Sequence, residues 1–245
     1  MASGHNVLLE GDTGTGKTYS VRAFAATKGL PFYTVMMNGS LDMGVLLGAY
    51  SPTEDGKLEW VDGVITSMVR EGRGVVLFDE INMAIERNIA RFYDLFDARR
   101  EIVLYEHHGE VLRVAPGSDF LVVAAYNPGY LGTRPLSQAL PNRFAFKMEF
   151  DYDEAIEAQL VVSGSLLEVA HKLRGMKREI KTPVSTNMLI EFCEIALAFS
   201  VDYAIANWCQ TFPRHERQSV AQVMGLYKAR LAEDIDRAAR EMEDL

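Results

Sequence analysis

The chain has 245 residues, 48% of them hydrophobic, and a formal net charge of -9 at pH 7. A chain of this length buries a sizeable core without cross-links. Its acidity argues against a broad nucleic-acid-binding face, although a locally basic pore is compatible with the same net charge. No apolar run approaches the roughly 18 residues of a membrane-spanning helix, and the first residues, MASGHN, resemble neither a signal peptide nor a transit sequence. We therefore expect a cytoplasmic protein without a membrane span.

The first predicted element is a strand over 6–10, which leads into the glycine-rich stretch GDTGTGKT at 11–18. Two glycines separated by four residues, then a lysine and a threonine, fit the P-loop pattern, in which backbone N–H groups wrap a polyphosphate. A helix over 17–28 follows and directs its N-terminus at the phosphates, so that Lys17 reaches the β and γ phosphates and Thr18 binds Mg²⁺. A turn without a ligand is the alternative. The residues expected to contact the nucleotide are Gly11, Asp12, Thr13, Gly14, Thr15, Gly16, Lys17, Thr18 and Tyr19.

A strand over 32–37 comes next, and a helix over 62–71 precedes a buried strand over 74–78. The last of these runs directly into two acids, Asp79 and Glu80. Asp79 would hold Mg²⁺ through its water shell, and Glu80 would polarise the attacking water as general base. A core strand with an acidic end is the alternative. The preceding P-loop favours the hydrolytic interpretation.

Two segments interrupt the alternation of strands and helices. The segment over about 49–61 contains an Asp-Gly turn and is predicted to form a small hairpin, and the segment over 100–114 is predicted to form a second one. His107 and His108 lie at the tip of the second hairpin. They lack partners for a metal site, so a solvated turn is favoured.

A helix is predicted over 85–99, because Ile85, Ile89, Phe92 and Phe96 repeat at helical spacing and are expected in the core. Further strands are predicted over 120–126 and 144–149. Short apolar runs that alternate with amphipathic stretches are typical of a parallel α/β sheet. We therefore expect residues 1–150 to form an α/β nucleotide-binding core that carries the two hairpins as insertions.

From residue 151 the strand patterns stop, and residues 151–245 are expected to form an all-helical lid. Helices are predicted over 153–162, 165–178, 187–210 and 217–243. The last of these has opposite charges three and four residues apart, which is typical of a solvated helix with one apolar face. Cys193 and Cys209 lie in apolar helical surroundings. They are expected to be small core residues rather than a disulfide or a metal site.

The order of these motifs resembles that of the AAA+ ATPases, and more narrowly of the MoxR group with its CbbQ/NorQ-type branch. The resemblance covers nearly the whole chain and is carried by GDTGTGKT, LFDEINMA, YNPGY, LPNRFAF and DGKLEWVDG. It implies a P-loop NTPase fold, with a parallel sheet flanked by helices and a C-terminal all-helical lid, and it implies ATP and Mg²⁺ as cofactors. By this resemblance the Walker A residues are Lys17 and Thr18, the Walker B pair is Asp79 and Glu80, and sensor 1 is Asn127.

The resemblance also assigns roles beyond the Walker motifs. Arg143 matches the arginine that family members insert into the site of the neighbouring subunit, where a guanidinium neutralises charge on the transferred phosphoryl group. A surface arginine beside a turn is the alternative. Asn38 matches a residue that restrains Glu80, and a turn residue is equally compatible with that position. The two hairpins resemble pore- or rim-facing inserts, with Tyr50, Trp60 and the tip over 107–109 as contact candidates.

Two features depart from the family pattern. Asn187 stands where a sensor 2 arginine is expected, and Arg174 or Arg178 would have to replace it. Ten residues precede Gly11, fewer than in relatives, so that adenine contacts are expected from the lid and from Asn6 unless the chain has been shortened. Both departures affect nucleotide affinity and base selectivity more than phosphate binding.

The resemblance implies an oligomeric ring, hexameric by analogy, that uses ATP to remodel or activate a client protein. A von Willebrand factor A-domain protein would serve as the adaptor. A nucleotide-dependent binding module with little turnover is one alternative, and a nucleic-acid-associated AAA+ motor is another. A P-loop kinase fits less well, because the acid pair suits activation of water rather than of an acceptor.

Overall fold

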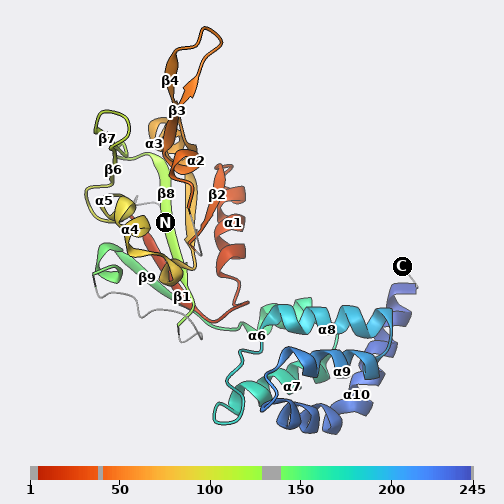
Figure 1. Cartoon of the computed structure of the whole chain (residues 1–245). Helices are drawn as coiled ribbons and strands as arrows, with labels where there is room; N and C mark the ends of the chain where they lie inside the picture. The colour runs from red at the N-terminus through yellow and green to blue at the C-terminus, as the bar shows by residue number, and fades with distance from the viewer. Residues whose placement is uncertain (1–4, 38–40, 129–138, 244–245) are drawn as a thin grey trace. The chain divides into compact units, whose positions relative to one another are not determined.

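The computed structural model describes residues 5–37, 41–128 and 139–243. The chain divides into two compact units, the first of residues 1–11 and 16–150 and the second of residues 12–15 and 151–245. Figure 1 labels most of the helices and strands of both units.

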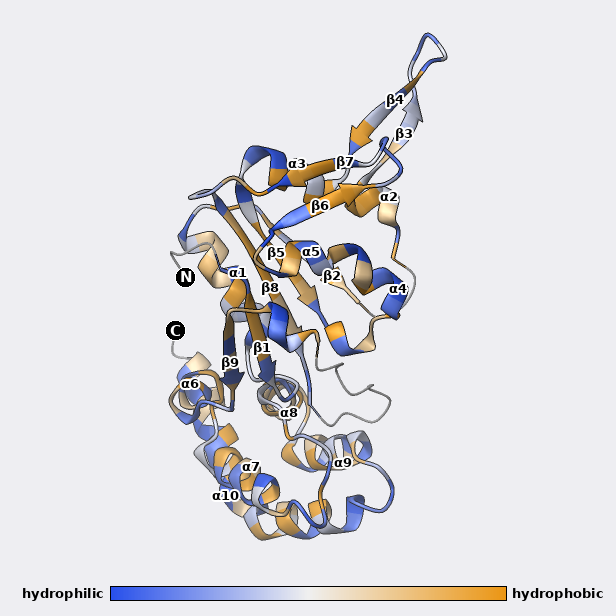
Figure 2. Ribbon diagram, turned by 90° about the vertical axis from the view of Figure 1, so that its left-hand side faces the viewer, coloured by the Kyte–Doolittle hydropathy of each residue, from blue (hydrophilic) through white to orange (hydrophobic). Residues whose placement is uncertain are grey.

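The first unit is built on a parallel five-stranded sheet with the order β2-β5-β8-β1-β9, which confirms the predicted α/β class. Its strands are β1 (Val7–Gly11), β2 (Phe32–Met36), β5 (Arg73–Asp79), β8 (Asp119–Tyr126) and β9 (Phe146–Phe150). The two central strands β5 and β8 are largely buried and appear predominantly orange in Figure 2. Continuous apolar runs of this kind are expected for parallel strands that are covered on both faces.

The two faces of this sheet pack against different helices, because successive side chains of a strand point to opposite faces. On one face, Leu77 and Val123 pack with Val21 and Ala25 of α1 (Lys17–Thr27). On the other face, Phe78 and its neighbours pack against several short helices. These are α2 (Met43–Leu46), α3 (Val64–Glu71), the 3₁₀ turn η1 (Ile81–Met83), α4 (Glu86–Ile89), η2 (Ala90–Phe92) and α5 (Tyr93–Phe96).

The prediction of one helix over 85–99 is wrong in detail, since α4, η2 and α5 divide this segment. Ile89, Phe92 and Leu95 are all buried and are three residues apart, a spacing that a 3₁₀ turn aligns on one face. Phe92 packs its ring 4.9 Å from that of Phe78. Ile85 is exposed, contrary to expectation, because it precedes the first turn of α4 and lies off the buried face.

Both predicted hairpins are present. The first consists of β3 (Gly48–Pro52) and β4 (Leu58–Asp62), and the second of β6 (Glu101–Leu104) and β7 (Glu110–Arg113). Figure 2 shows the β3–β4 hairpin projecting from the rest of the first unit.

Between residues 151 and 243, the regular elements of the second unit are all helices. Its helices are α6 (Glu154–Leu160), α7 (Gly164–Gly175), α8 (Thr186–Ala198), α9 (Val201–Thr211) and α10 (Arg217–Glu243), and η3 (Pro141–Arg143) belongs to the first unit. The prediction of one helix over 187–210 is wrong, because Ser200 caps a new helix by accepting a hydrogen bond from the Tyr203 N–H.

Cys193 and Cys209 are both free, as expected. Within the described residues, no helix is long and apolar enough to cross a membrane.

Candidate functional site

The glycine-rich loop leaves the carboxyl end of β1 and enters α1. Gly14 and Gly16 have φ angles of 75° and 86°, a region that side-chain-bearing residues rarely adopt. Gly16 is also the N-cap of α1, and no side chain caps the first turn of that helix. The N-terminus of a helix that follows a glycine-rich loop is a characteristic anion-binding site.

Lys17 is buried beneath this loop, with 7% of its surface exposed. Its ammonium donates hydrogen bonds to the Gly11 carbonyl at 2.8 Å and to Oδ1 of Asn127 at 2.7 Å. The predicted Walker A lysine and sensor 1 residue, 110 positions apart in sequence, therefore meet through a direct contact. This meeting requires β1 and β8 to be neighbours in the sheet, as their parallel pairing makes them.

Thr18 and Asp79 meet in the same way. The Thr18 hydroxyl donates to Oδ2 of Asp79 at 2.8 Å, and the backbone N–H of Glu80 donates to Oδ1 of the same carboxylate at 3.0 Å. Mg²⁺ prefers hard oxygen donors, and two neighbouring ligands of an octahedral Mg²⁺ stand about 2.9 Å apart. The hydroxyl and the carboxylate therefore fit a magnesium ion.

Glu80 adopts a left-handed backbone conformation with φ of 54°, which is uncommon for a residue with a side chain. It follows Asp79 directly and begins the turn that continues as η1. Backbone strain of this kind costs on the order of 1–3 kcal/mol and is often found at functional sites.

Two further contacts at the ends of the strands were not foreseen from the sequence. Asn82 donates from Nδ2 to the main-chain carbonyl of Asn127 at 3.1 Å. The Tyr126 hydroxyl donates to the Glu10 carboxylate, and burial together with this contact raises the pKa of Tyr126. The one available sequence sign was the polar Asn82 between the apolar residues Ile81 and Met83, because Ile81 is in the core.

The remaining predicted nucleotide contacts have varied positions. Asp12 and Thr15 lie in the loop, where the Thr15 hydroxyl donates to the Asp12 carbonyl at 2.9 Å. Tyr19 is 77% exposed, and its contact with a nucleotide stays a prediction. Asn38 lies outside the described residues. Asn6 is buried and donates to the Leu95 and Phe96 carbonyls, which does not support its expected role at adenine.

Arg143 is not brought to the loop. It lies just before β9, at the amino ends of the strands, and donates from Nη1 to Oδ2 of Asp97 at 3.0 Å. Its guanidinium also stands 4.4 Å from the centre of the Tyr93 ring. The glycine-rich loop leaves from the carboxyl end of β1, and a five-residue strand separates its two ends by roughly 15 Å.

A cavity of about 1190 Å³ opens at the same amino edge. Asn6, Asp97, Arg100 and Arg143 contribute to its walls, whereas none of the residues that surround Lys17 does so. This cavity is therefore separate from the site at the carboxyl edge. The geometry around Lys17, rather than cavity size, identifies the candidate site.

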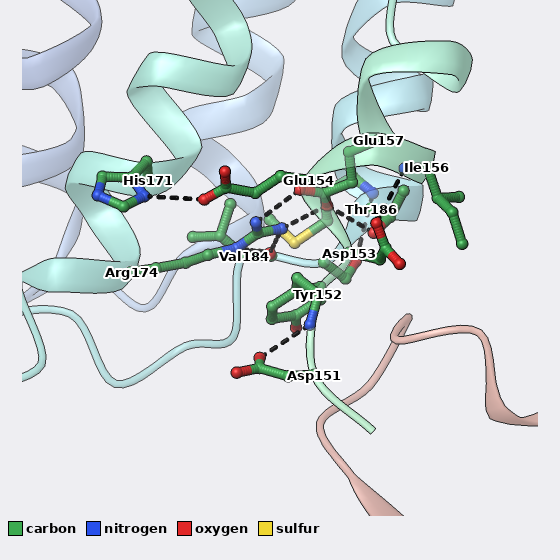
Figure 3. A network of polar contacts seen from close by, with 12 residues as sticks. Asp151, Tyr152, Asp153, Glu154, Ile156, Glu157, His171, Arg174, Val184 and Thr186 are labelled. Atoms are coloured by element: carbon green, nitrogen blue, oxygen red, sulfur yellow. Dashed lines mark hydrogen bonds and ion pairs between the residues drawn. The ribbon is translucent and has the colours of Figure 1, made fainter. Parts of the chain in front are cut away.

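In the second unit, Arg174 takes part in the buried network drawn in Figure 3. Its guanidinium forms two hydrogen bonds with Glu157, at 2.8 and 2.7 Å, and two with the Val184 carbonyl, at 3.0 and 2.8 Å. It also stacks on the Tyr152 ring at 3.7 Å. Burial alone would raise the pKa of Glu157, but hydrogen bonds from Arg174 and Thr186 hold it below its usual value.

This network bears on the missing sensor 2 arginine. Arg174 is engaged within the second unit, and its contacts hold the segment that leads into α8. Asn187 and Arg178 are exposed. Substitution of Arg174 for the family arginine therefore has no support from these contacts.

The two hairpins meet through aromatic side chains. The Tyr50 hydroxyl lies 3.1 Å from Nδ1 of His107 and 3.0 Å from Nε2 of His108, and the Trp60 and His107 rings stack at 4.6 Å. Arg70 bridges the hairpins by contacting both Asp62 and Glu110. His107 is thus half-buried against Trp60, which the prediction of a solvated turn did not include, whereas His108 is exposed as that prediction expects. Among the described residues, no three His, Cys, Asp or Glu side chains are arranged to hold a metal ion.

Comparison with known proteins adds independent information. The AAA domain family described as the dynein-related subfamily matches residues 6–144 of this chain. Protein NorQ of Paracoccus denitrificans is 37% identical over 196 residues, which cover 75% of this chain and 70% of NorQ. An uncharacterized protein of Staphylococcus epidermidis is 38% identical over 218 residues, which cover 82% of this chain and 81% of that protein.

A solved structure shares the fold. The crystal structure of a protein proposed to be an ATPase, from Cytophaga hutchinsonii, matches 97% of this chain and 76% of its own chain. The TM-score is 0.50 and the sequence identity is 22%, so the likeness concerns the fold alone.

Proposed function

The chain belongs to the AAA domain family, dynein-related subfamily, and from this premise we propose that it is a magnesium-dependent ATP hydrolase. The observation that carries the proposal is the convergence of Lys17, Thr18, Asp79 and Asn127 at the carboxyl edge of one sheet. AAA domains bind nucleotides, and relatedness to NorQ supports the same assignment. Hydrolysis is the part that goes beyond family membership.

In the proposed mechanism the loop over 11–16 and the N-terminus of α1 bind the polyphosphate. Lys17 exchanges its contacts with Gly11 and Asn127 for phosphate oxygens. Thr18 and Asp79 would hold Mg²⁺, which supplies charge neutralisation and polarises phosphate oxygens when it is bound. Glu80 accepts the proton of the attacking water, and the Asn127 amide orients that water.

The test compares phosphate release by the wild type with that by Glu80→Gln. The amide cannot accept the proton of water, so we expect phosphate release to fall at least roughly 100-fold, the lower end of what a general base contributes. Binding of a fluorescent ATP analogue should change little. Glu71→Gln, at the exposed end of α3, is the matched control and should behave as the wild type. Equal phosphate release by the wild type and Glu80→Gln would refute the proposed hydrolysis.

We further propose that Arg143 acts on the nucleotide of a neighbouring protomer. Its place at the amino edge, roughly the length of β1 away from its own loop, supports action in trans over action in cis. The specific activity should then rise with protein concentration. Arg143→Ala should lower kcat roughly 1000-fold or more with nucleotide binding retained, whereas Arg113→Ala, at an exposed arginine of β7, should have no effect.

A mixing experiment separates a shared site from an independent one. Arg143→Ala keeps its own Glu80, and Glu80→Gln keeps its own Arg143. Mixed assemblies therefore contain some complete composite sites, and they should regain activity that neither variant shows alone. If no mixture of the two exceeds the activity of the separate variants, Arg143 does not act across a protomer boundary.

Resemblance to the MoxR group and kinship with NorQ support a ring, hexameric by analogy, that remodels or activates a client protein. The proposed partner is a von Willebrand factor A-domain adaptor. Light scattering with and without Mg-ATP tests assembly, and capture of partners by an ATP-loaded Glu80→Gln variant tests for the adaptor. If light scattering shows a monomer both with and without Mg-ATP, the proposed ring is contradicted.

A second candidate function is a nucleotide-dependent binding module with little turnover. Two observations favour it: Asn187 replaces the expected arginine, and Arg174 is committed to Glu157. A binding module would assemble on ATP but release phosphate no faster than Glu80→Gln. The comparison described above therefore distinguishes the two functions.

A further inference from the structure

Asn82 occupies an unusual place beside the proposed hydrolytic site. It lies in η1, the 3₁₀ turn that follows the acids, and only 7% of its surface is exposed. Its side-chain Nδ2 donates to the main-chain carbonyl of Asn127 at 3.1 Å. A buried amide loses water on folding, and a buried donor–acceptor pair of this kind is costly to break.

The contact joins two segments that are far apart in sequence. The acids end β5 and Asn127 follows β8, and these two strands are neighbours in the sheet. Beyond the last paired residues, however, the strand ladder no longer fixes the relative position of the two turns. Asn82 supplies a hydrogen bond at this point, 45 positions from its acceptor.

The turn that carries Glu80 is held by local contacts on its own side. The Met83 N–H donates to the Glu80 carbonyl at 2.8 Å, and the Glu80 N–H donates to the Asp79 carboxylate. These bonds define the shape of the turn but do not fix it against β8. The bond from Asn82 links this turn, and with it Glu80, to the segment that carries Asn127.

The bond from Asn82 also differs from the other contact made by Asn127. Lys17 donates to the Asn127 side chain, and that contact competes with phosphate oxygens for the same ammonium. Asn82 instead donates to the main-chain carbonyl of Asn127, so this bond does not compete with phosphate for the Lys17 ammonium. The Asn82 bond is therefore compatible with displacement of Lys17 by a nucleotide.

We propose that Asn82 is a positioning residue for ATP hydrolysis, which holds the Glu80 turn and the Asn127 side chain in register around the attacking water. In this proposal Asn82 acts through these two residues rather than by binding nucleotide or Mg²⁺ itself. The proposal rests on the proposed function. In this proposal, one side-chain hydrogen bond fixes the position of Glu80, the general base, relative to the Asn127 amide that orients the water.

The chemistry of the contact gives a specific test, because the acceptor is a carbonyl and only a donor can replace the amide. Asn82→Ala removes the donor. Asn82→Asp keeps the shape but places a carboxylate against the carbonyl at neutral pH, and it becomes a donor only when the carboxyl is protonated. Burial and the neighbouring carbonyl oxygen would raise the pKa of this new carboxyl above its ordinary value of about 3.9. Activity of Asn82→Asp relative to the wild type should therefore rise as the pH falls from 8 to 6, while the relative activity of Asn82→Ala stays constant.

The experiment measures steady-state hydrolysis, nucleotide affinity and hydrogen exchange on the same preparations. We expect Asn82→Ala to lower kcat by about tenfold or more, the size expected when a buried hydrogen bond is lost, with KM and the Kd of a fluorescent ATP analogue within about twofold. Asn207→Ala, at an exposed asparagine of α9, is the control and should match the wild type. An unchanged kcat, or a loss that follows Kd instead, would overturn the proposal.

Hydrogen exchange provides a readout that does not depend on turnover. Amides in peptides covering residues 120–128 should exchange faster in nucleotide-free Asn82→Ala than in the wild type, while peptides of α10 should not change. Unchanged exchange over 120–128 would refute the link whether or not the protein hydrolyses ATP. A wild type that releases no phosphate would refute the proposed function in its own test, and the exchange data would still decide whether Asn82 holds the turn.

Discussion

The buried pair of Arg174 and Glu157 offers a direct test of the energetics of the second unit. Glu157 has 2% of its surface exposed, and its carboxylate accepts hydrogen bonds from Arg174 and Thr186. Replacement of Arg174 by alanine would leave this carboxylate buried with only the Thr186 hydroxyl as a partner. Removal of one member of a buried ion pair typically costs about 3–5 kcal/mol, because the other charge is left uncompensated.

The expected loss lies toward the lower end of that range. The Arg174 side chain retains 21% exposure, so water reaches part of the space that alanine would open. The lost bonds to the Val184 carbonyl and the lost stacking on Tyr152 act in the opposite direction. We therefore expect Arg174→Ala to lower the free energy of unfolding of this unit by about 3 kcal/mol at pH 7.

The assay uses the two tryptophans of the chain, one in each unit. Trp208 is buried in the second unit against Phe192 and Phe212, so a Trp60→Phe background makes its fluorescence a reporter of that unit. Urea titration then gives the free energy of unfolding. Arg230→Ala is the matched control, because Arg230 pairs with Glu168 at the exposed surface, and it should show no measurable loss.

The sign of the pH dependence provides the refuting result. The pKa of Glu157 is depressed in the folded protein. The pair therefore contributes its full stabilisation of the folded unit above the ordinary pKa of 4.5, and this contribution is lost as the pH falls through the folded-state pKa. In Arg174→Ala the carboxyl can take up a proton, and the cost of the substitution should shrink on acidification. Adding Glu157→Gln to Arg174→Ala should restore part of the stability at pH 7. A loss that is independent of pH and unaffected by Glu157→Gln would refute the uncompensated-charge explanation.

Three further outcomes follow from individual contacts. Thr18→Val removes the hydroxyl that contacts Asp79, and it should weaken ATP binding by about tenfold in the presence of Mg²⁺ but not with EDTA, as measured by fluorescence titration. Burial raises the pKa of the Cys193 thiol above 9.0, so its reaction with a disulfide reagent should be much slower in the folded than in the unfolded chain and should accelerate with pH. Arg70→Ala should speed hydrogen exchange in both hairpins but cost only about 0–1 kcal/mol in global stability, because the pairs are partly exposed.

The sequence was sufficient for the sheet and the phosphate loop because both depend on local patterns. A central parallel strand is a short apolar run, as in GVVLF, and the P-loop spacing is continuous along the chain. The segment over 85–99 was mispredicted because α and 3₁₀ turns place apolar residues at overlapping spacings. The break at Ser200 was missed because apolar residues continue on both sides, and only the capping serine marks the end of α8.

The contacts that refine the site could not be derived in the same way. Asn82 reaches a main-chain carbonyl, and no residue type at the other end identifies an acceptor that every residue carries. The packing of His107 on Trp60 joins two hairpins whose relative placement depends on α3 and the sheet. Arg174 looked available because charge alone is visible in the sequence, whereas its partner Glu157 lies one helix away.

The first unit also suggests how events at the hairpins could reach the site. Arg70, Tyr50 and the two histidines tie β3–β4 to β6–β7, and β7 leads through a short segment into β8, which ends at Asn127. Coupling along such a route requires an element with two arrangements, since a rigid sheet alone transmits no change of state. Under the proposed function Lys17 meets this requirement, because its bond to Asn127 and its bonds to phosphate would compete for one ammonium. A displacement of β8 that weakens the Lys17–Asn127 bond would favour the phosphate-bound arrangement. By linkage, nucleotide binding would shift the equilibrium of the hairpins by the same free energy.

Hydrogen exchange in the hairpins should therefore respond to ATP in the wild type, and Asn127→Ala should abolish that response while the hairpins remain folded.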